Sequence, residues 1–311
     1  MEWNVTDTNR LDSFVAAQKN GLSRSKIKKL IKDGLVGVNG NIVTKPAFRL
    51  KNRDVVKVSD VASVTSENFE VKPIDLNLGV LFEDDICIVI NKPAGISVHP
   101  GSGMNQDEKT ILNGVAHLFN ERGIPFNLEG VLVHRLDKDT TGALIVAKDL
   151  ESHELLQKQF AKRSVSKQYL AIVYGIPNPP KAKIDAPVGR NLLNRMKMSV
   201  FRTGNSREAQ TTYSTLDTGE NCALLLCDLH TGRTHQIRVH LNYINHPILG
   251  DSTYGTHVSD NMSDELNIKS PCLHSWKLKF KSGKKIVEVE APIPKDFEDA
   301  LVKARLWLNS I

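Results

Sequence analysis

Apolar residues recur at helical spacing twice near the start of the chain, in residues 10–17 and again in residues 24–32. Ser23 is a suitable N-cap for the second segment, and Gly34 follows that segment as a stop signal. The spacing predicts two short amphipathic helices. Their apolar stripes consist of Leu11, Phe14 and Val15 in the first helix and of Ile27, Leu30 and Ile31 in the second.

A hairpin and a further strand are predicted next. Residues 36–43 alternate around Asn39-Gly40, a pair that suits a type I′ turn, and residues 54–58 have strand character. The stretch that follows is rich in Ser, Thr, Asp and Glu and has no apolar period, which is typical of a linker. We therefore expect three segments: a small α/β unit over 9–60, a linker over 61–74 and a larger domain over 75–311.

The larger domain shows short apolar runs separated by turns. Predicted strands outnumber helices, which favours an α+β fold with a mixed, largely antiparallel sheet over a doubly wound parallel sheet. The last hairpin has one polar face, because Lys and Glu alternate with its apolar residues. The predicted strands cover residues 86–90, 142–147, 167–174, 209–216, 222–229, 276–281 and 287–290, and the predicted helices cover 150–162 and 296–308.

The composition excludes several classes of protein. The chain has 311 residues, of which 40% are hydrophobic and 24% charged, as is ordinary for globular proteins. No apolar run approaches the ~18–20 residues of a membrane span, and residues 1–7 do not resemble a signal peptide, so we expect a cytoplasmic protein. The cysteines form no C-x-x-C pair, so we expect buried free thiols and no zinc site. They are Cys87, Cys222, Cys227 and Cys272.

The positive charge is concentrated at the start of the chain. The net charge is +6, and residues 1–60 contain 12 Lys and Arg against 6 Asp and Glu. In the second predicted helix, Arg24, Lys28 and Lys32 stand four residues apart and form one basic ridge, which can follow a phosphate backbone. A solvated charged surface is the alternative. With the two short helices and the V-N-G hairpin, the ridge resembles the S4 RNA-binding domain over residues 9–60.

The segment H-R-L-D-K-D-T-T-G at residues 134–142 is the most informative for chemistry. It lies between the apolar runs 131–133 and 143–146, so we expect Asp137 to lie on a loop between two buried elements. With histidine, arginine and lysine beside it, Asp137 is a candidate nucleophile or base. One alternative is a loop aspartate that only satisfies turn hydrogen bonds. Another is a hydrolase that uses Asp137 together with Asp139.

Five segments in order resemble the motifs of pseudouridine synthases that carry the large-ribosomal-subunit type of catalytic domain. The similarity spans about residues 76–292, and an S4-like unit precedes it, as in many members of that family. The segments are N-K-P-A-G with V-H-P at 91–100, the H-R-L-D segment at 134–142, K-Q-Y-L-A-I-V-Y-G at 167–175, T-G-R-T-H-Q-I-R-V-H-L at 231–241 and H-P-I-L-G-D at 246–251.

The resemblance implies an enzyme that detaches the uracil of an RNA uridine from the ribose C1′, turns it and rejoins it through C5. Asp137 would be the catalytic aspartate, acting at C1′ or at C6 of the ring. Tyr169 would stack on the flipped uracil, and Arg238 would pair with Asp137. Arg135 would contact the RNA backbone or fill the gap left by the flipped base. Since the reaction is an isomerisation, we expect neither a metal nor another cofactor.

These roles are physically sensible. Extracting the base from the stack costs a few kcal/mol, stacking on an aromatic face recovers ~1–3 kcal/mol, and a counter-ion keeps a buried carboxylate ionised. From the residues alone, Tyr169 could equally be a core tyrosine and Arg238 a surface arginine.

RNA is the expected partner, and a monomer is the expected state. The domain order favours large-subunit (23S) ribosomal RNA as the substrate. Transfer RNA is one alternative. A catalytically silent RNA-binding ribosome-assembly factor is another.

Overall fold

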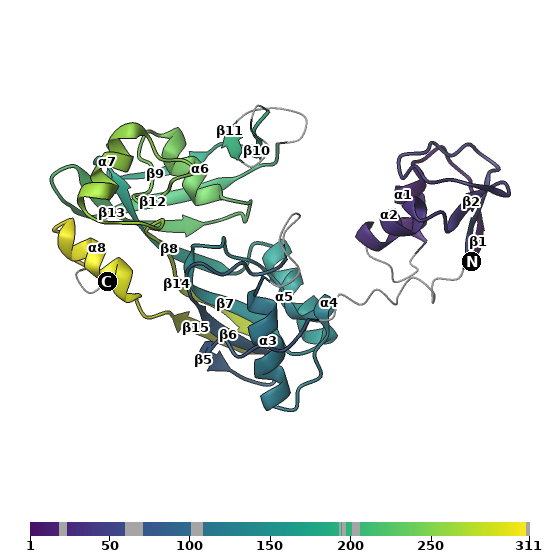
Figure 1. Cartoon of the computed structure of the whole chain (residues 1–311), viewed down its shortest axis with the longest axis horizontal. Helices are drawn as coiled ribbons and strands as arrows, with labels where there is room; N and C mark the ends of the chain where they lie inside the picture. Colours follow the sequence, from purple (N-terminus) through teal and green to yellow (C-terminus); the bar gives the residue numbers. More distant parts are fainter. Residues whose placement is uncertain are drawn as a thin grey trace. The chain divides into compact units, whose positions relative to one another are not determined.

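The computed structural model describes residues 1–18, 24–59, 71–100, 108–192, 194, 197–200 and 206–308, without the side chains of residues 24–26 and 29. Two compact units divide the chain, Met1–Glu70 and Val71–Ile311, and Figure 1 labels their elements. Among the described residues, none of the helices combines the length and the apolar character needed to cross a membrane.

The N-terminal unit packs two helices against a small antiparallel sheet of order β1-β4-β2-β3. Both predicted helices and the hairpin are confirmed, and Asn39 and Gly40 have φ of 51° and 80°, as a type I′ turn requires. The first strand was not predicted, because three residues are too short to show an alternation. The elements are β1 (Glu2–Asn4), α1 (Leu11–Ala17), α2 (Arg24–Lys32), β2 (Val36–Val38), β3 (Asn41–Ile42) and β4 (Val55–Val58).

Most of the predicted linker, 61–74, lies outside the described residues. Its last residues pack against the second unit. Val71 is buried in the core of that unit, and the amide of Ile74 donates to the carbonyl of Asn113 at 3.1 Å. The chain is thus anchored to the second unit a few residues before residue 75, where the sequence suggested that the larger domain begins.

The second unit is built on a large sheet. Within the described residues, nine strands pair in the order β5-β6-β7-β14-β8-β13-β12-β9, with β15 beside β14. The strands are β5 (Gly79–Glu83), β6 (Cys87–Lys92), β7 (Thr141–Ala147), β8 (Ser166–Tyr174), β9 (Lys181–Asp185), β12 (Gln210–Thr218), β13 (Cys222–Leu229), β14 (Leu273–Ser282) and β15 (Lys285–Glu290), and a separate hairpin consists of β10 (Val188–Arg190) and β11 (Met198–Val200).

Pairing within this sheet is antiparallel except between β7 and β14, which run parallel. This confirms the α+β fold with a mixed, largely antiparallel sheet. Helices α3 and α5 lie beside the half that contains β6 and β7, and α6 and α7 lie at the end that contains β9, β12 and β13 (Figure 1). The helices are α3 (Ile111–Glu121), α4 (Leu128–Val131), α5 (Leu150–Ala161), α6 (Gln236–Tyr243), α7 (His257–Glu265) and α8 (Lys295–Lys303).

Strand β7 is buried on both faces. Leu144 and Val146 belong to one apolar cluster, and Ala143 and Ile145 belong to the cluster on the other side. A strand packed in this way is a rigid support for the loop that precedes it, which contains Asp137. The cysteines are all buried and free, as expected.

The closing helix is shorter than predicted. The apolar pattern indicated a helix over 296–308, but α8 ends at Lys303. Arg305 has a φ of 55°, and the amide of Leu306 turns back to the carbonyl of Leu301 at 2.9 Å. Leu306 is still buried, so the apolar pattern continues past the point where the backbone leaves the helix.

The parallel pairing of β7 with β14 determines the backbone conformation at the end of the loop that contains Asp137. Gly142 lies opposite Ser275 and has a φ of 104°, and a Cβ at Gly142 would overlap the Ser275 carbonyl oxygen. Beside this pair, Thr141 Oγ1 and His274 Nδ1 form a hydrogen bond of 2.8 Å. The last two residues of the H-R-L-D-K-D-T-T-G segment therefore have a structural role at this junction.

We expect Gly142→Ala to destabilise the fold strongly. The positive φ costs about 1–2 kcal/mol for a residue with a Cβ, and the overlap with backbone adds roughly 1–3 kcal/mol. The control is Gly123→Ala, where φ is also positive at 63° but no atom lies within 4 Å of the new Cβ. Urea unfolding measures both. Equal losses of unfolding free energy in the two variants would contradict a role for the close approach.

His274 makes stability depend on pH. Burial lowers its pKa from 6.5 to about 4, although the Ala291 carbonyl opposes the shift. The unfolded chain takes up this proton and the folded chain does not, so stability falls as the pH drops below 6.5 towards 4. Between about pH 7.5 and pH 5.5, we expect the unfolding free energy of the wild type to fall by about 1 kcal/mol more than that of His274→Gln. A pH dependence identical to that of the wild type would contradict this role of His274.

Candidate active site

A buried lysine ties the Asp137 loop to β6. Lys92 is 1% exposed, and its Nζ donates to the carbonyls of Pro93 at 2.7 Å, Lys138 at 2.7 Å and Thr140 at 3.0 Å. Burial lowers the pKa of Lys92 to about 8, while two nearby carboxylates oppose the shift. Because two of the three acceptors lie in the loop, Lys92 sets the backbone directly after Asp137.

His134, the first residue of the H-R-L-D-K-D-T-T-G segment, attaches the start of the Asp137 loop to β7. His134 Nε2 accepts a hydrogen bond from the amide of Ile145 at 2.9 Å, and its ring stacks on Phe160. Burial, with a smaller effect of Lys167, lowers the pKa of His134 to about 3, so the ring is neutral and acts as an acceptor. The amide of Thr140 closes a turn by donating to the Asp137 carbonyl at 3.2 Å.

Arg238 approaches Asp137 from α6. The distance from Arg238 Nη1 to Asp137 Oδ2 is 3.4 Å, so the expected contact is present. Arg238 is 8% exposed, which rules out the surface arginine considered from the sequence. Its main partner is Asp251, whose two oxygens accept from Nε at 2.7 Å and from Nη2 at 2.8 Å. Asp137 therefore shares the guanidinium with a second carboxylate.

Several groups fix Arg238. Burial alone would lower its pKa, but the hydrogen bonds and charge of Asp251, with the charge of Asp137, outweigh burial and raise the pKa. Its Cζ lies 5.1 Å from the centre of the Tyr254 ring, as in a cation–π contact. Asp251 is 1% exposed and also accepts from the amides of Thr253 at 3.0 Å and Tyr254 at 3.2 Å. The guanidinium is thus a fixed cation.

His235 faces the other oxygen of Asp137. Its Nε2 lies 3.9 Å from Asp137 Oδ1, and its Nδ1 and the Tyr254 hydroxyl form a hydrogen bond of 2.8 Å. The backbone of His235 is left-handed, with a φ of 54°, at the start of α6. Burial lowers the pKa of His235 despite the opposing charge of Asp137. His235 and Arg238 therefore approach Asp137 from one short helix.

Tyr169 joins the site from the middle of the sheet. It lies in β8 opposite Cys227 of β13 and Ser275 of β14 and is 5% exposed. Burial raises the pKa of Tyr169, a hydrogen bond with Ser275 opposes this, and the charge of Asp137 adds to it. The phenol therefore stays protonated. Tyr169 is both a core residue and part of the wall beside Asp137.

The structure brings four of the predicted site residues into one small depression of about 50 Å³. Arg135 is exposed at this depression, and its Nη2 donates to Thr234 Oγ1 at 2.9 Å. The four predicted residues that line it are Arg135, Asp137, Tyr169 and Arg238.

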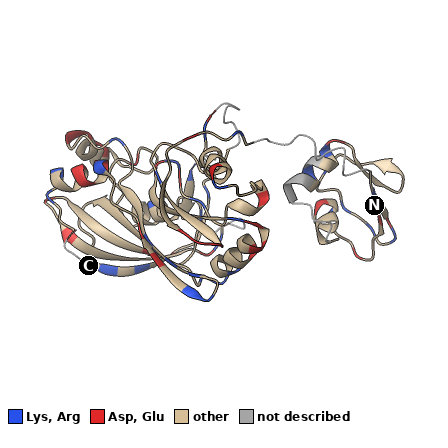
Figure 2. Cartoon of the chain, turned by 90° about the horizontal axis from the view of Figure 1, so that it is seen from below, with Lys and Arg blue, Asp and Glu red and all other residues tan. Residues whose placement is uncertain are grey.

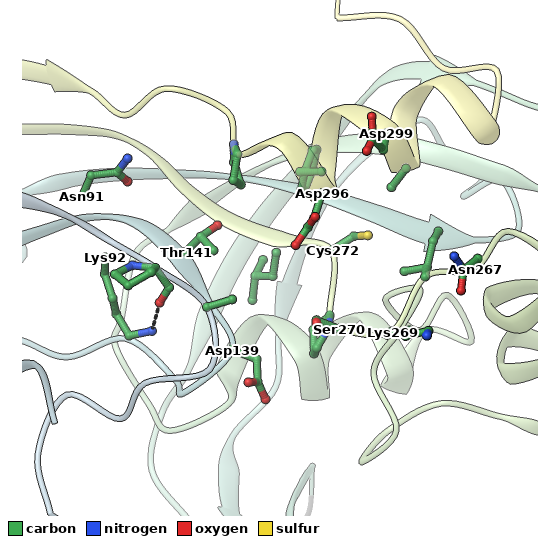
Figure 3. A pocket seen from close by; sticks show the side chains of 18 of the residues that line it. Asn91, Lys92, Asp139, Thr141, Asn267, Lys269, Ser270, Cys272, Asp296 and Asp299 are labelled. Atoms are coloured by element: carbon green, nitrogen blue, oxygen red, sulfur yellow. Dashed lines mark hydrogen bonds between the residues drawn. The ribbon is translucent and has the colours of Figure 1, made fainter. Parts of the chain in front are cut away.

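A larger cavity of about 860 Å³ does not include this group of residues. Lys92 and Asp139 line it, together with Asp296 and Asp299 of α8 (Figure 3). Asp137, Tyr169 and Arg238 are not among its lining residues. The smaller depression is therefore the candidate active site, although the larger cavity offers more room.

The basic ridge of α2 lies in the other unit. Lys28 and Lys32 are exposed, while the apolar stripe of the same helix is buried. The side chain of Arg24 lies outside the described residues. Lys and Arg are interspersed with Asp and Glu over both units (Figure 2), so the ridge is a local feature of one helix.

Among the residues that the structure describes, no three His, Cys, Asp or Glu side chains are arranged to hold a metal ion. His240, which the sequence places near His235, bonds instead to the Ala186 carbonyl at 2.8 Å and to Thr211 Oγ1 at 3.0 Å. It is fully buried, and burial lowers its pKa. His240 therefore has a structural role: its hydrogen bonds attach α6 to Thr211 of β12 and to Ala186.

Sequence reasoning missed four residues of the site. Lys92, His235 and Asp251 stand inside segments already singled out, at 91–100, 231–241 and 246–251, but spacing does not show which polar groups are buried. Tyr254 lies beyond these segments and has no sequence signal. Among the four, Lys92 alone has a sequence signal, because it is a polar residue at the end of an apolar run. A polar side chain buried there needs hydrogen-bond partners.

Comparisons with known proteins agree with this geometry. A family model of RNA pseudouridylate synthases matches residues 86–243, and one of the S4 domain matches residues 9–56. The ribosomal large subunit pseudouridine synthase D of Vibrio cholerae is 38% identical over 95% of this chain and 91% of its own length. The protein of that name from Zymomonas mobilis is 38% identical over 93% and 92%.

The fold is shared with a solved human structure, RNA pseudouridylate synthase domain containing 4, at a TM-score of 0.62 and 27% identity. The match covers 74% of this chain and 94% of that one. Asp137, Tyr169 and Arg238 all lie within the stretch matched by the family model. The chain belongs to the RNA pseudouridylate synthase family, whose members isomerise uridine in RNA to pseudouridine, and it carries an S4 domain near its N-terminus.

Proposed function

We propose that this enzyme converts specific uridines of large-subunit ribosomal RNA and that Asp137, Tyr169 and Arg238 perform the chemistry. The observation that carries the proposal is the placement of Asp137. Its two oxygens are approached by Arg238 and His235, and it shares one depression with Tyr169.

The geometry leaves Asp137 able to react. During isomerisation the N1–C1′ bond breaks, the uracil turns and a C5–C1′ bond forms, while C5 loses its hydrogen and N1 gains one. Asp137 adds to C1′ or to C6, and either route uses an oxygen lone pair. A bidentate arginine would occupy both oxygens. Because Asp251 takes two of the guanidinium bonds, only the 3.4 Å contact reaches Asp137.

Tyr169 and Arg135 act on the substrate base and strand. The Tyr169 ring offers a face for the extracted uracil, and such stacking contributes ~1–3 kcal/mol per base. Because burial raises the pKa of Tyr169, its hydroxyl remains a hydrogen-bond donor beside the ring. Arg135 is exposed at the depression, and within the described part of the chain its side chain donates to one partner, the Thr234 hydroxyl. It can therefore turn to the RNA backbone or to the gap that the base leaves.

Three observations support ribosomal RNA as the substrate: the names of the two 38% identical relatives, the S4 domain, and the excess of positive charge in residues 1–60. We assign RNA binding to residues 9–60 and catalysis to 75–311, in a cytoplasmic monomer that needs no cofactor. Transfer RNA is the alternative substrate. A silent assembly factor is disfavoured, because the three reactive side chains are present and placed together.

We expect Asp137→Asn to lower the single-turnover rate of pseudouridine formation at least roughly 1,000-fold, because the amide cannot act as the nucleophile. The affinity for RNA should not weaken by more than about twofold, since the amide has the same shape as the carboxylate and removes a negative charge from an RNA-binding site. Rates are measured with purified protein and ribosomal RNA transcripts, and affinities by filter binding.

The matched control is Asp139→Asn, two residues further along the same loop. Asp139 lines the larger cavity rather than the site, so this variant should keep the wild-type rate within a few-fold. Equal losses in both variants would contradict a role specific to Asp137 among the carboxylates of this loop. Retained isomerisation in Asp137→Asn would overturn the assignment.

The ridge of α2 should set much of the salt dependence of binding. We expect the triple alanine variant of Arg24, Lys28 and Lys32 to reduce the slope of log affinity against log salt by roughly 0.7–0.9 for each lost phosphate contact. The measurement is a titration of RNA binding at several salt concentrations. An unchanged slope would show that this helix does not touch RNA.

A further inference from the structure

A cavity of about 430 Å³ lies beside the catalytic depression, between the β10–β11 hairpin and the end of α6. Tyr254 lines this cavity, while its hydroxyl bonds to His235 and its ring contacts Arg238. The amide of Met198 in β11 donates to the same hydroxyl at 2.8 Å. Tyr254 therefore lines this cavity and contacts two residues, His235 and Arg238, that line the catalytic depression.

The charge of this region suits RNA. In the sequence, residues 186–207 contain five Lys and Arg and no Asp or Glu, and the structure describes three of these, Arg190, Lys197 and Arg207. Among the described lining residues, Lys197 is the charged one and no carboxylate is present. The 860 Å³ cavity differs, because three carboxylates line it along with three lysines, so its opposite charges balance. These are Asp139, Asp296, Asp299, Lys92, Lys269 and Lys303. Of the two, the cavity beside the hairpin is the one whose described lining carries a net positive charge.

Its polar and aromatic groups suit an unstacked base. Tyr243, at the end of α6, is 57% exposed and lines the cavity, so its ring offers a stacking face. Asn242 and Thr253 supply an amide and a hydroxyl in the same wall. Ser199 Oγ is buried there without a hydrogen-bond partner among the described residues, although buried polar atoms nearly always have one.

We propose that this cavity binds the nucleotide next to the flipped uridine, with its base stacked on Tyr243 and its phosphate near Lys197. The inference rests on the proposed function, because it takes the uridine to occupy the Asp137 depression. Consecutive nucleotides of one strand can occupy the two hollows because Tyr254, in the wall of one, contacts His235 and Arg238, in the wall of the other. Enzymes that read single-stranded RNA combine stacking faces with cationic grooves in this way.

The first test compares Tyr243→Ala with Tyr243→Phe. Loss of a stacking face worth ~1–3 kcal/mol weakens binding of a substrate RNA roughly 5- to 140-fold. The phenylalanine variant stays within about twofold because it keeps the ring. The single-turnover rate at saturating RNA remains near that of the wild type, since Tyr243 does not touch the reacting atoms. Trp307→Ala, which removes a 65% exposed aromatic side chain outside this cavity, leaves the affinity unchanged.

The second test uses a short synthetic RNA that the wild-type enzyme converts, with an abasic nucleotide immediately 5′ or 3′ of the target uridine. Removing the base that stacks on Tyr243 weakens binding to the wild type but has little further effect on Tyr243→Ala. The two changes are therefore non-additive at one of the two positions. Full additivity at both positions overturns the subsite.

The outcomes separate this inference from the proposed function. If the wild type forms no pseudouridine in ribosomal or transfer RNA, the proposed function fails. If the wild type is active and Tyr243→Ala binds RNA as tightly as Trp307→Ala does, the subsite fails and the assignment of Asp137 stands.

Discussion

The buried guanidinium of Arg238 is the constraint on which the site depends, because a cation out of water needs a permanent partner. Asp251 is that partner, with bonds of 2.7 and 2.8 Å, and Asp137 receives only a longer contact of 3.4 Å. This division separates two tasks. One carboxylate keeps the arginine charged and in place, and the other stays accessible to substrate. With Asp137 as its sole partner, Arg238 would occupy the oxygens that the proposed reaction uses.

The backbone around Asp137 is constrained just as closely. Strand β7 is buried on both faces, and its parallel contact with β14 tolerates only glycine at residue 142. Lys92 adds three hydrogen bonds, two of them to the loop itself. In the proposed reaction Asp137 has to reach one carbon atom of the uridine. A rigid support for the loop favours this, because small misplacements lower the rate strongly. The central part of the sheet therefore serves to position a single side chain.

The sequence predicted the fold class and the three residues to which we assign the chemistry, but not the support around them. Helices α1 and α2, the Asn39-Gly40 hairpin and most long strands follow from local patterns. Strands β10 and β11 have three residues each, too few for an alternation, and the end of α8 depends on a left-handed residue that apolar spacing does not show. Asp251, Tyr254 and Lys92 act through burial, which arises only when distant segments meet.

The central claim is that this chain isomerises uridine through Asp137. A position-resolved pseudouridine map of cellular RNA tests it most directly, in cells that lack the gene and are complemented with wild type or with Asp137→Asn. We predict that specific uridines of large-subunit ribosomal RNA lose the modification and that only the wild type restores it. Restoration by the Asp137→Asn protein would contradict the account, as would an unchanged map together with an inactive purified wild-type enzyme.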